Sequence, residues 1–370
     1  MMLTKGDDYP LHQTPEPVMY AGHDRRFYER YFFNGYSREF DLFFAMGMGI
    51  YPCANLIDAS FCVTWQGVQH NLHASRVLGF ERMDLWTGPI RLEIVEPLKT
   101  LRILIEDNEH GIRGDLSFHA RIEAIEEPRQ SMRHGARVIM DCTRLTQLGS
   151  YSGWLEIKGR RIEVTPDRFL GTRDRSWGVR GVGAHDTQLI IPPVDFQTCF
   201  LWAQLNFEDL GICYGTFEDA QGKVWHSHGV IAPVGGGEAV TVASGKVTPR
   251  FKPGTRHASD AVLDMVREDG TKVEITMEFQ PMQFYMRGLG YFHQEWGHGM
   301  YHGPSAVHYE TFDHREVNEA VFDFNHVETC CKARMVDDDG RIREGVGVME
   351  QLIVGPHGPS GFKDFMDVAV

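Results

Sequence analysis

Residues 116–124 give the most direct indication of the fold class, because they have the sequence Leu116-Ser117-Phe118-His119-Ala120-Arg121-Ile122-Glu123-Ala124. Apolar and polar side chains alternate along this stretch with a period of two, as in a β-strand with one buried face. Other short segments rich in β-branched and aromatic residues are separated by turn formers such as Asn55, Gly67 and Gly159. The segments that we predict to be strands are 41–51, 59–65, 101–107, 114–125, 154–164, 197–206, 211–218, 223–231, 272–279, 306–312 and 346–354.

Helical periodicity is weak along the whole chain. Only residues 24–31 and part of 128–141 are expected to form short helices. Many short strands with few helices predict an all-β protein, built from two antiparallel β-barrels or curved sheets in tandem. Gly183, Pro192 and Pro193 interrupt the strand pattern near the middle of the chain. We therefore expect one β-domain at residues 1–185 and a second at residues 186–370.

Composition excludes several classes of function. The chain has 370 residues with a formal net charge of −14, which opposes general affinity for nucleic acid or for an anionic membrane surface. No stretch approaches the roughly 18 consecutive apolar residues that a membrane-spanning helix needs. Residues 1–10 lack the pattern of a secretory signal, and the seven cysteines are scattered without a disulfide framework. A cytoplasmic protein is the expectation.

Residues 171–180 concentrate unusual chemistry in the decapeptide Gly171-Thr172-Arg173-Asp174-Arg175-Ser176-Trp177-Gly178-Val179-Arg180. We expect a turn-rich segment in which the flanking arginines keep the pKa of Asp174 low. Trp177 offers an apolar face with one N–H donor. This combination suits a pocket wall that carries a fixed polar group, and it equally suits a structural corner with a buried tryptophan and an ion pair between strands. The sequence leaves both interpretations open.

The same decapeptide carries a family resemblance, together with Trp154-Leu155 and the stretch Arg343-Glu344-Gly345-Val346-Gly347-Val348-Met349-Glu350. These motifs resemble the D-H-x-W-G region of the carotenoid 1,2-hydratase, AttH-like and hydroxyneurosporene synthase group, and bacterial two-domain proteins related to it. The resemblance implies tandem lipocalin-like β-domains with a hydrophobic cavity near their junction. It also implies hydration, cyclisation or cycloaddition of terpenoid or polyketide substrates, typically without a redox cofactor. Arg175 departs from the hydratase pattern, which has a histidine there, and arginine hardly ever gives up its proton.

Histidines and aromatic residues gather in two further places. His226 and His228 share one face of a predicted strand, and His326 has the same relation to Glu328. Residues 279–309 combine aromatic and methionine side chains with histidines, among them His293, His298 and His302. Such a segment can line a deformable apolar pocket or can be an ordinary aromatic core. The histidine spacing matches no established metal signature, so we expect no metal site, and no phosphate or axial-ligand motif predicts another cofactor.

These observations lead to a specific hypothesis about function. The chain is expected to be a cofactor-independent lyase or hydratase that acts by acid–base chemistry on a hydrophobic small molecule, such as a terpenoid, steroid or aromatic compound, near the domain junction. The alternative is a non-catalytic carrier of a hydrophobic ligand, and a homodimer is possible in either case. The predicted catalytic residues are Asp174, His293 and Tyr285. The predicted substrate-binding residues are Arg173, Trp177, Arg180, Trp202, Phe284, Trp296 and His298.

Overall fold

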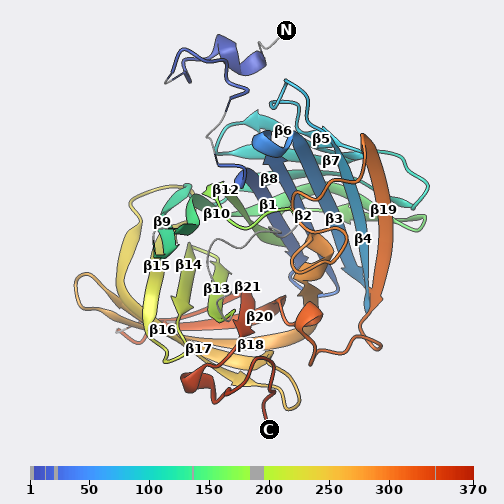
Figure 1. Ribbon diagram of the computed structural model, residues 1–370. Coiled ribbons are helices and arrows are strands. Elements are labelled where there is room, and N and C mark those ends of the chain that lie inside the picture. The colour runs from blue at the N-terminus through green and yellow to red at the C-terminus, as the bar shows by residue number, and fades with distance from the viewer. Residues whose placement is uncertain (1–3, 13, 21–23, 136, 184–195, 338) are drawn as a thin grey trace.

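The computed structural model describes residues 4–12, 14–20, 24–135, 137–183, 196–337 and 339–370, and it confirms an all-β protein (Figure 1). The helical elements among these residues are single turns of 3-10 helix: η1 (Lys5–Asp8), η2 (Pro52–Ala54), η3 (Met286–Leu289), η4 (Phe322–Phe324) and η5 (Gly358–Ser360). None of the helices in the described ranges is long and apolar enough to cross a bilayer.

The first sheet has thirteen strands and is nearly closed. Its hydrogen-bonded order is β19-β4-β3-β2-β1-β12-β10-β8-β7-β6-β5, and β9 and β11 both pair with β10. These strands are β1 (Phe27–Ser37), β2 (Leu42–Tyr51), β3 (Leu56–Trp65), β4 (Val68–Val77), β5 (Trp86–Thr87), β6 (Ile90–Glu96), β7 (Thr100–Ile105), β8 (Ile112–Ala120), β9 (Ile125–His134), β10 (Arg137–Ile157), β11 (Arg160–Val164), β12 (Phe169–Val179) and β19 (Ser305–Asp313).

The remaining strands form a closed barrel, in which β21 pairs with β13 and completes the circle. The strands, in barrel order, are β13 (Thr198–Phe207), β14 (Leu210–Glu218), β15 (Val224–Pro233), β16 (Val240–Phe251), β17 (Ala258–Arg267), β18 (Lys272–Tyr285), β20 (Val327–Asp337) and β21 (Ile342–Val354). The closure is narrowest between β15 and β16, which pair at two positions, Val230↔Thr241 and Ile231↔Val240.

One strand of the second half belongs to the first sheet. β19 leaves the barrel between β18 and β20 and pairs with β4 along nine residues, from Ser305↔Arg76 to Asp313↔Val68. Figure 1 shows it in orange at the outer edge of the blue strands. The predicted domain boundary between residues 185 and 186 lies outside the described residues, so the division 1–185 and 186–370 stays a prediction.

Three apolar cores account for most of the packing. The first sheet encloses one cluster that includes Phe33, Phe44 and Phe118, and the barrel encloses a second. The third lies between the two sheets, where Phe32 and Phe43 meet Trp202 and other barrel residues. The ring centroids of Phe32 and Trp202 are 6.2 Å apart. Each sheet therefore has one face on its own core, and the two sheets pack against each other through their opposite faces.

Both predicted helices are wrong. Residues 24–31 overlap β1, which pairs with β2 on one side and β12 on the other, and this double pairing outweighs a weak helical pattern. Residues 128–141 form parts of β9 and β10, which pair as a hairpin. Gly135, with φ of 58°, takes the left-handed conformation at the turn. The predicted strand 154–164 is likewise a hairpin of β10 and β11, turning at Lys158 and Gly159.

Candidate functional site between the two sheets

The decapeptide 171–180 is largely strand rather than turn, and this decides where its side chains point. β12 lies in the middle of the first sheet, paired with β1 and β10. Neighbouring residues of a strand face opposite sides of the sheet, so Asp174 points away from Arg173, Arg175 and Trp177. The Arg175 guanidinium lies 4.4 Å from the ring centroid of Tyr31, a residue of the first core. Asp174 faces the barrel, and Trp177 does not share its surroundings.

Asp174 belongs to a polar group that we call the interface cluster. The cluster consists of Glu127, Arg144, Asp174, Trp202, His228, His326 and Glu350. The first three come from β9, β10 and β12 of the first sheet, and Trp202, His228 and Glu350 come from β13, β15 and β21 of the barrel. His326 directly precedes β20.

Arg144 is the centre of the interface cluster. Its Nε lies 3.8 Å from Asp174 Oδ2, and its Nη1 lies 3.8 Å from Glu127 Oε2. Both distances are too long for a hydrogen bond, so these contacts are ion pairs. The guanidinium also lies 5.8 Å from the centroid of the Trp202 ring on the barrel. A permanently charged group thus stands between two carboxylates and an aromatic face.

The barrel side brings two histidine–carboxylate contacts. His228 Nε2 lies 3.2 Å from Glu127 Oε1, across the interface between the sheets. His326 Nε2 and Glu350 Oε1 are 2.6 Å apart, within the barrel wall. A Cβ atom on Gly215 of β14 would lie 2.6 Å from the His228 ring and 3.0 Å from the Trp202 ring. Glycine at this position therefore lets the two rings approach each other.

Burial raises the pKa values of both carboxyls on either side of Arg144, and their different charged neighbours separate these values. Burial raises the pKa of Asp174 to about 6, because the opposing effect of Arg144 is weakened by repulsion from Glu127 and Glu350. This corrects the expectation of a low pKa, since Arg173 and Arg175 lie on the other face of β12. Burial also disfavours the charged form of Glu127, but His228 and Arg144 together hold its pKa at about 2. Two carboxyls of different proton affinity therefore flank one cation.

The interface cluster keeps unused hydrogen-bonding capacity. The side chains of Asp174 and Arg144 are 13% and 17% exposed although their surroundings are buried. Trp202 Nε1, His326 Nδ1 and both amide atoms of Gln204 are buried and have no hydrogen-bond partner among the described residues. Buried polar atoms normally find partners, so the unpaired atoms of Trp202 and His326 in the cluster, and of Gln204 two residues further along β13, are suited to a bound molecule or to ordered water.

Arg180 and His298 are brought together beside the interface cluster. Arg180 Nη2 lies 3.3 Å from His298 Nδ1, while His298 Nε2 donates to the carbonyl of Leu289 at 2.8 Å. The ring centroid of Tyr291 lies 4.5 Å from that of His298 and 4.7 Å from that of His326. A continuous chain of contacts therefore connects these two predicted binding residues with the histidine that contacts Glu350.

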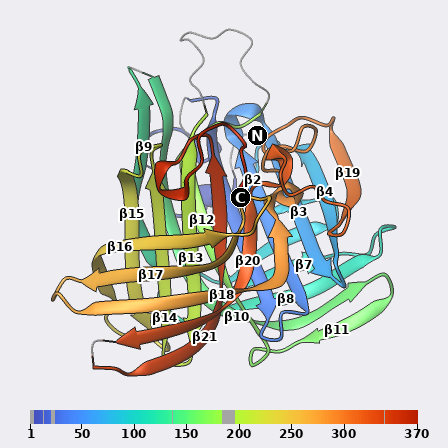
Figure 2. The same cartoon turned by 90° about the horizontal axis from the view of Figure 1, so that it is seen from below.

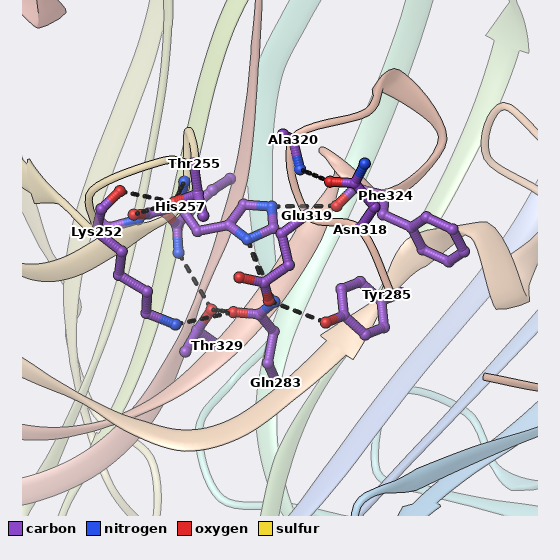
Figure 3. Close-up of polar contacts among 12 residues, drawn as sticks. Lys252, Thr255, His257, Gln283, Tyr285, Asn318, Glu319, Ala320, Phe324 and Thr329 are labelled. Carbon is purple, nitrogen blue, oxygen red and sulfur yellow. Dashed lines mark hydrogen bonds and ion pairs between the residues drawn. The ribbon is translucent and has the colours of Figure 1, made fainter. Parts of the chain in front are cut away.

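Tyr285 lies in a separate polar group, shown in Figure 3. Its hydroxyl donates to Glu319 Oε1 at 2.9 Å, and the Gln283 amide donates to the same oxygen at 2.6 Å. His257 Nε2 donates to the carbonyl of Phe324, and the other ring nitrogen, Nδ1, lies 3.6 Å from Glu319 Oε1. These contacts attach the segment between β19 and β20 to the barrel. None of the contacts described for Tyr285 reaches Asp174, and Phe284 stacks on Phe43 in the core between the sheets.

His293 and Trp296 lie in a third group, over β4 and β19. His293 Nε2 and His73 Nε2 each lie 3.2 Å from Glu310 Oε1. Trp296 stacks on His302, with centroids 3.9 Å apart. Within the described residues, His293 has no contact with Asp174. The expected arrangement, with His293 or Tyr285 opposite Asp174, is therefore not the one that the structure has.

The His73–His293–Glu310 group resembles a metal site in composition but not in hydrogen-bond polarity. Backbone N–H groups of Glu295 and Trp296 donate to His293 Nδ1 at 3.1 and 2.9 Å. The proton of neutral His293 is therefore on Nε2, which donates it to Glu310. A histidine that binds metal through Nε2 normally keeps its proton on Nδ1 and donates it outward. The two backbone donors oppose that state.

Comparison with known proteins places the chain in a family. The model of DUF8625, a family of unknown function, matches residues 3–363. The chain belongs to this family. No curated protein matches it in sequence.

Solved structures of CghA share the fold of this DUF8625 member. CghA solved with Sch210972 is 9% identical, with a TM-score of 0.51 and 89% of each chain covered. A second CghA structure has the same identity and TM-score over 89% of this chain and 88% of that one. Kievitone hydratase from Nectria haematococca is 11% identical over 88% of each chain, with a TM-score of 0.46. At such identities the likeness to CghA concerns the fold alone.

Proposed function

We propose that this protein is a cofactor-independent enzyme that transfers protons to and from a hydrophobic small molecule at the interface cluster. Hydration, dehydration and related cyclisations are the reactions that such a site suits. The observation that carries the proposal is the pair of carboxyls on Arg144: Asp174, with a pKa of about 6, and Glu127, with a pKa of about 2. A general base works best when its pKa lies near the pH of the reaction.

Each group of the cluster has a role in this proposal. Asp174 accepts a proton from substrate or water, since it is ionised at neutral pH and yet binds a proton readily. Arg144 remains protonated because Glu127 and Asp174 outweigh the effect of its burial, so it can stabilise negative charge on a substrate oxygen. His326, which contacts Glu350, and His228, which contacts Glu127, are the candidate proton donors on the barrel side.

The composition of the surroundings supports a largely apolar substrate with a few polar atoms. Phe200, Trp202 and Val348 belong to the apolar core that adjoins the cluster. Hydroxyl groups of a ligand would satisfy the unpaired polar atoms of Trp202 and Gln204, because a hydroxyl accepts from the N–H donors and donates to Gln204 Oε1. Terpenoid, steroid and aromatic compounds that carry hydroxyl or carbonyl groups have this character.

A carrier protein would not need this arrangement. Binding of a hydrophobic ligand needs apolar walls, whereas buried charges lower stability unless they are paired. The interface cluster gathers three carboxylates, one arginine and two histidines from both sheets. This concentration of titratable groups favours catalysis over transport.

The proposal is tested by screening for turnover. Purified protein is incubated with oxygenated terpenoid, steroid and phenolic compounds, and products that have gained or lost one water, or cyclised without change of mass, are detected by chromatography with mass spectrometry. We expect at least one class to be converted by the wild-type protein and to be converted far more slowly by the Asp174→Asn variant. Tight binding of such compounds without any conversion would favour the carrier instead.

A further inference from the structure

A second group of metal-binding residue types lies at one end of the barrel, away from the interface cluster. Cys199 is near the start of β13, Glu218 ends β14, and His357 follows β21. The pairing of β13 with β14 sets Cys199 opposite Glu218, and the C-terminal segment brings His357 beside them. The Cys199 sulfur, a carboxylate oxygen of Glu218 and a ring nitrogen of His357 all lie within 4.8 Å of one another.

We propose that Cys199, Glu218 and His357 form a binding site for a divalent transition-metal ion, with zinc as the best fit. Zinc accepts a mixed set of thiolate, imidazole and carboxylate ligands, at about 2.0 to 2.3 Å. Tetrahedral coordination at these lengths separates neighbouring ligand atoms by about 3.4 Å. His357 Nε2 and Glu218 Oε2 are 3.2 Å apart, which already matches one edge of that tetrahedron.

The charges around Glu218 favour a cation at this place. Glu218 is 9% exposed, and the ion pair that it makes within the described residues is with His357. No lysine or arginine of those residues forms an ion pair with this carboxylate. A buried carboxylate needs a positive partner, and a doubly charged ion would balance both the carboxylate and a thiolate at Cys199.

Hydrogen-bond polarity distinguishes this site from the His73–His293–Glu310 group. His357 Nδ1 lies 2.7 Å from Ser360 Oγ, and a hydroxyl can accept as well as donate. His357 can therefore place its proton on Nδ1 and leave Nε2 free for the metal, as histidine ligands usually do. His293 lacks this freedom because its Nδ1 receives two backbone N–H groups.

A bound ion would attach the C-terminal segment to the barrel. Gly358 N donates to the carbonyl of Ala220 in the β14–β15 turn at 2.8 Å, and His357 pairs with Phe362 in an isolated β-bridge. Phe362 packs in the barrel core, with its ring 5.0 Å from that of Phe251. In Figure 2 the red C-terminal segment runs beside the barrel strands. Metal binding should therefore stabilise the folded barrel through mass action.

The experiment uses the full chain, freed of metal with a chelator and then dialysed against zinc. We expect wild-type protein to retain zinc in elemental analysis, and its Tm to rise with zinc concentration. Cobalt(II) should give a thiolate-to-metal charge-transfer absorption. His357→Gln and Cys199→Ser should each weaken zinc binding by at least about tenfold, because loss of even an outer-shell partner of a metal ligand costs about that much. Cys199→Ser should also abolish the charge-transfer absorption.

His293→Gln is the matched control, because it removes one histidine from the other candidate group and should leave zinc content unchanged. Retention of zinc by His357→Gln and Cys199→Ser at the wild-type level would overturn the proposal, as would the absence of retained zinc in wild-type protein. If a variant fails to fold, the cobalt spectrum of wild-type protein decides: a spectrum without thiolate absorption contradicts the site. None of these measurements depends on the enzymatic activity proposed for the interface cluster.

Discussion

Asp174 Oδ2 lies 3.8 Å from Arg144 Nε, and yet the pKa of Asp174 is raised rather than lowered. An adjacent arginine on a protein surface would favour the carboxylate. Here burial acts in the opposite direction and is the larger effect, and Glu127 and Glu350 add repulsion. The ion pair therefore holds Asp174 in place without removing its affinity for a proton.

Replacement of Asp174 by asparagine should lower turnover about hundredfold or more, the usual effect of losing an acid–base group. Asparagine keeps the size of the side chain, but it replaces one carboxylate oxygen by an amide N–H donor and cannot accept the proton. The measurement is kcat on the substrate found by screening. Asp115→Asn is the control, since Asp115 forms an ion pair with Arg102 away from the interface cluster. Equal losses in both variants would contradict the role of Asp174.

Activity should rise with pH through about 6, the pKa of Asp174. A base is active when deprotonated, so the rate increases as pH passes upward through the pKa. The measurement is the pH profile of kcat/KM, which reports groups of the free enzyme. The residual activity of Asp174→Asn should lack this inflection. A wild-type rate that falls over the same interval would mean that Asp174 acts as an acid.

Asp174→Asn should also stabilise the protein at alkaline pH. The pKa of Asp174 is about 6 when folded, against an ordinary value of 3.8, so between these pH values the folded state holds a proton that the unfolded chain has lost. The free energy of unfolding therefore falls as pH rises from about 4 to about 6, by about 3 kcal/mol, and stays lower above that.

The measurement is the Tm of both proteins at pH 4 and pH 8. Asparagine carries no charge, so the variant should have the higher Tm at pH 8, and the difference should disappear at pH 4. Arg144 keeps Glu127 as a partner in the variant. A variant that is less stable than the wild type at pH 8 would support the interpretation of residues 171–180 as a structural corner.

The sequence predicted the fold class because alternation is a local property. The alternating stretch 116–124 pointed to a strand, and β8 runs through Ile112–Ala120. Strands without clear alternation were missed, among them β1, which is buried along most of its length. A strand covered on both faces shows an apolar run instead of a period of two. The turn expected at 171–180 was wrong because β12 obtains its conformation from its neighbours β1 and β10.

The site was predictable only in part. Asp174 and Trp202 were named from the sequence, and His228 and His326 were noticed through same-face patterns with His226 and Glu328. Glu127 and Arg144 carry no local signal, because each is one of several charged residues in its strand, and Glu350 was quoted only as part of the motif 343–350, with no role assigned to it. They meet Asp174 through pairing of β9, β10 and β12 and through packing against the barrel, and such long-range contacts have no signature in one sequence.

Removal of the charge of Arg144 should destabilise the protein. Arg144→Gln leaves Glu127 and Asp174 without their shared cation, and an uncompensated buried charge costs about 3–5 kcal/mol. The pKa of Asp174 should rise further, so the inflection in the pH profile of any residual activity should move upward. The measurement is urea unfolding at pH 8.

The double variant Glu127→Gln/Arg144→Gln provides the matched comparison. It removes one of the two carboxylates that the arginine balances, so it should recover part of the lost stability. A double variant that loses the sum of two independent effects would show that Glu127 and Arg144 are not coupled, contrary to their 3.8 Å contact.

Two tryptophans should respond differently to replacement by phenylalanine. Trp202 is fully buried between the sheets, under the Arg144 guanidinium, and loses its N–H donor in Trp202→Phe. That variant should lower turnover and should cost about 1 to 3 kcal/mol of stability through the smaller ring. Trp177 is 38% exposed and lies on the opposite face of β12 from Asp174, so Trp177→Phe should leave both quantities close to wild type. The measurement is kcat and Tm of both variants. A large loss of turnover in Trp177→Phe, with Tm unchanged, would place the substrate on the other face of β12 and contradict the interface cluster as the active site.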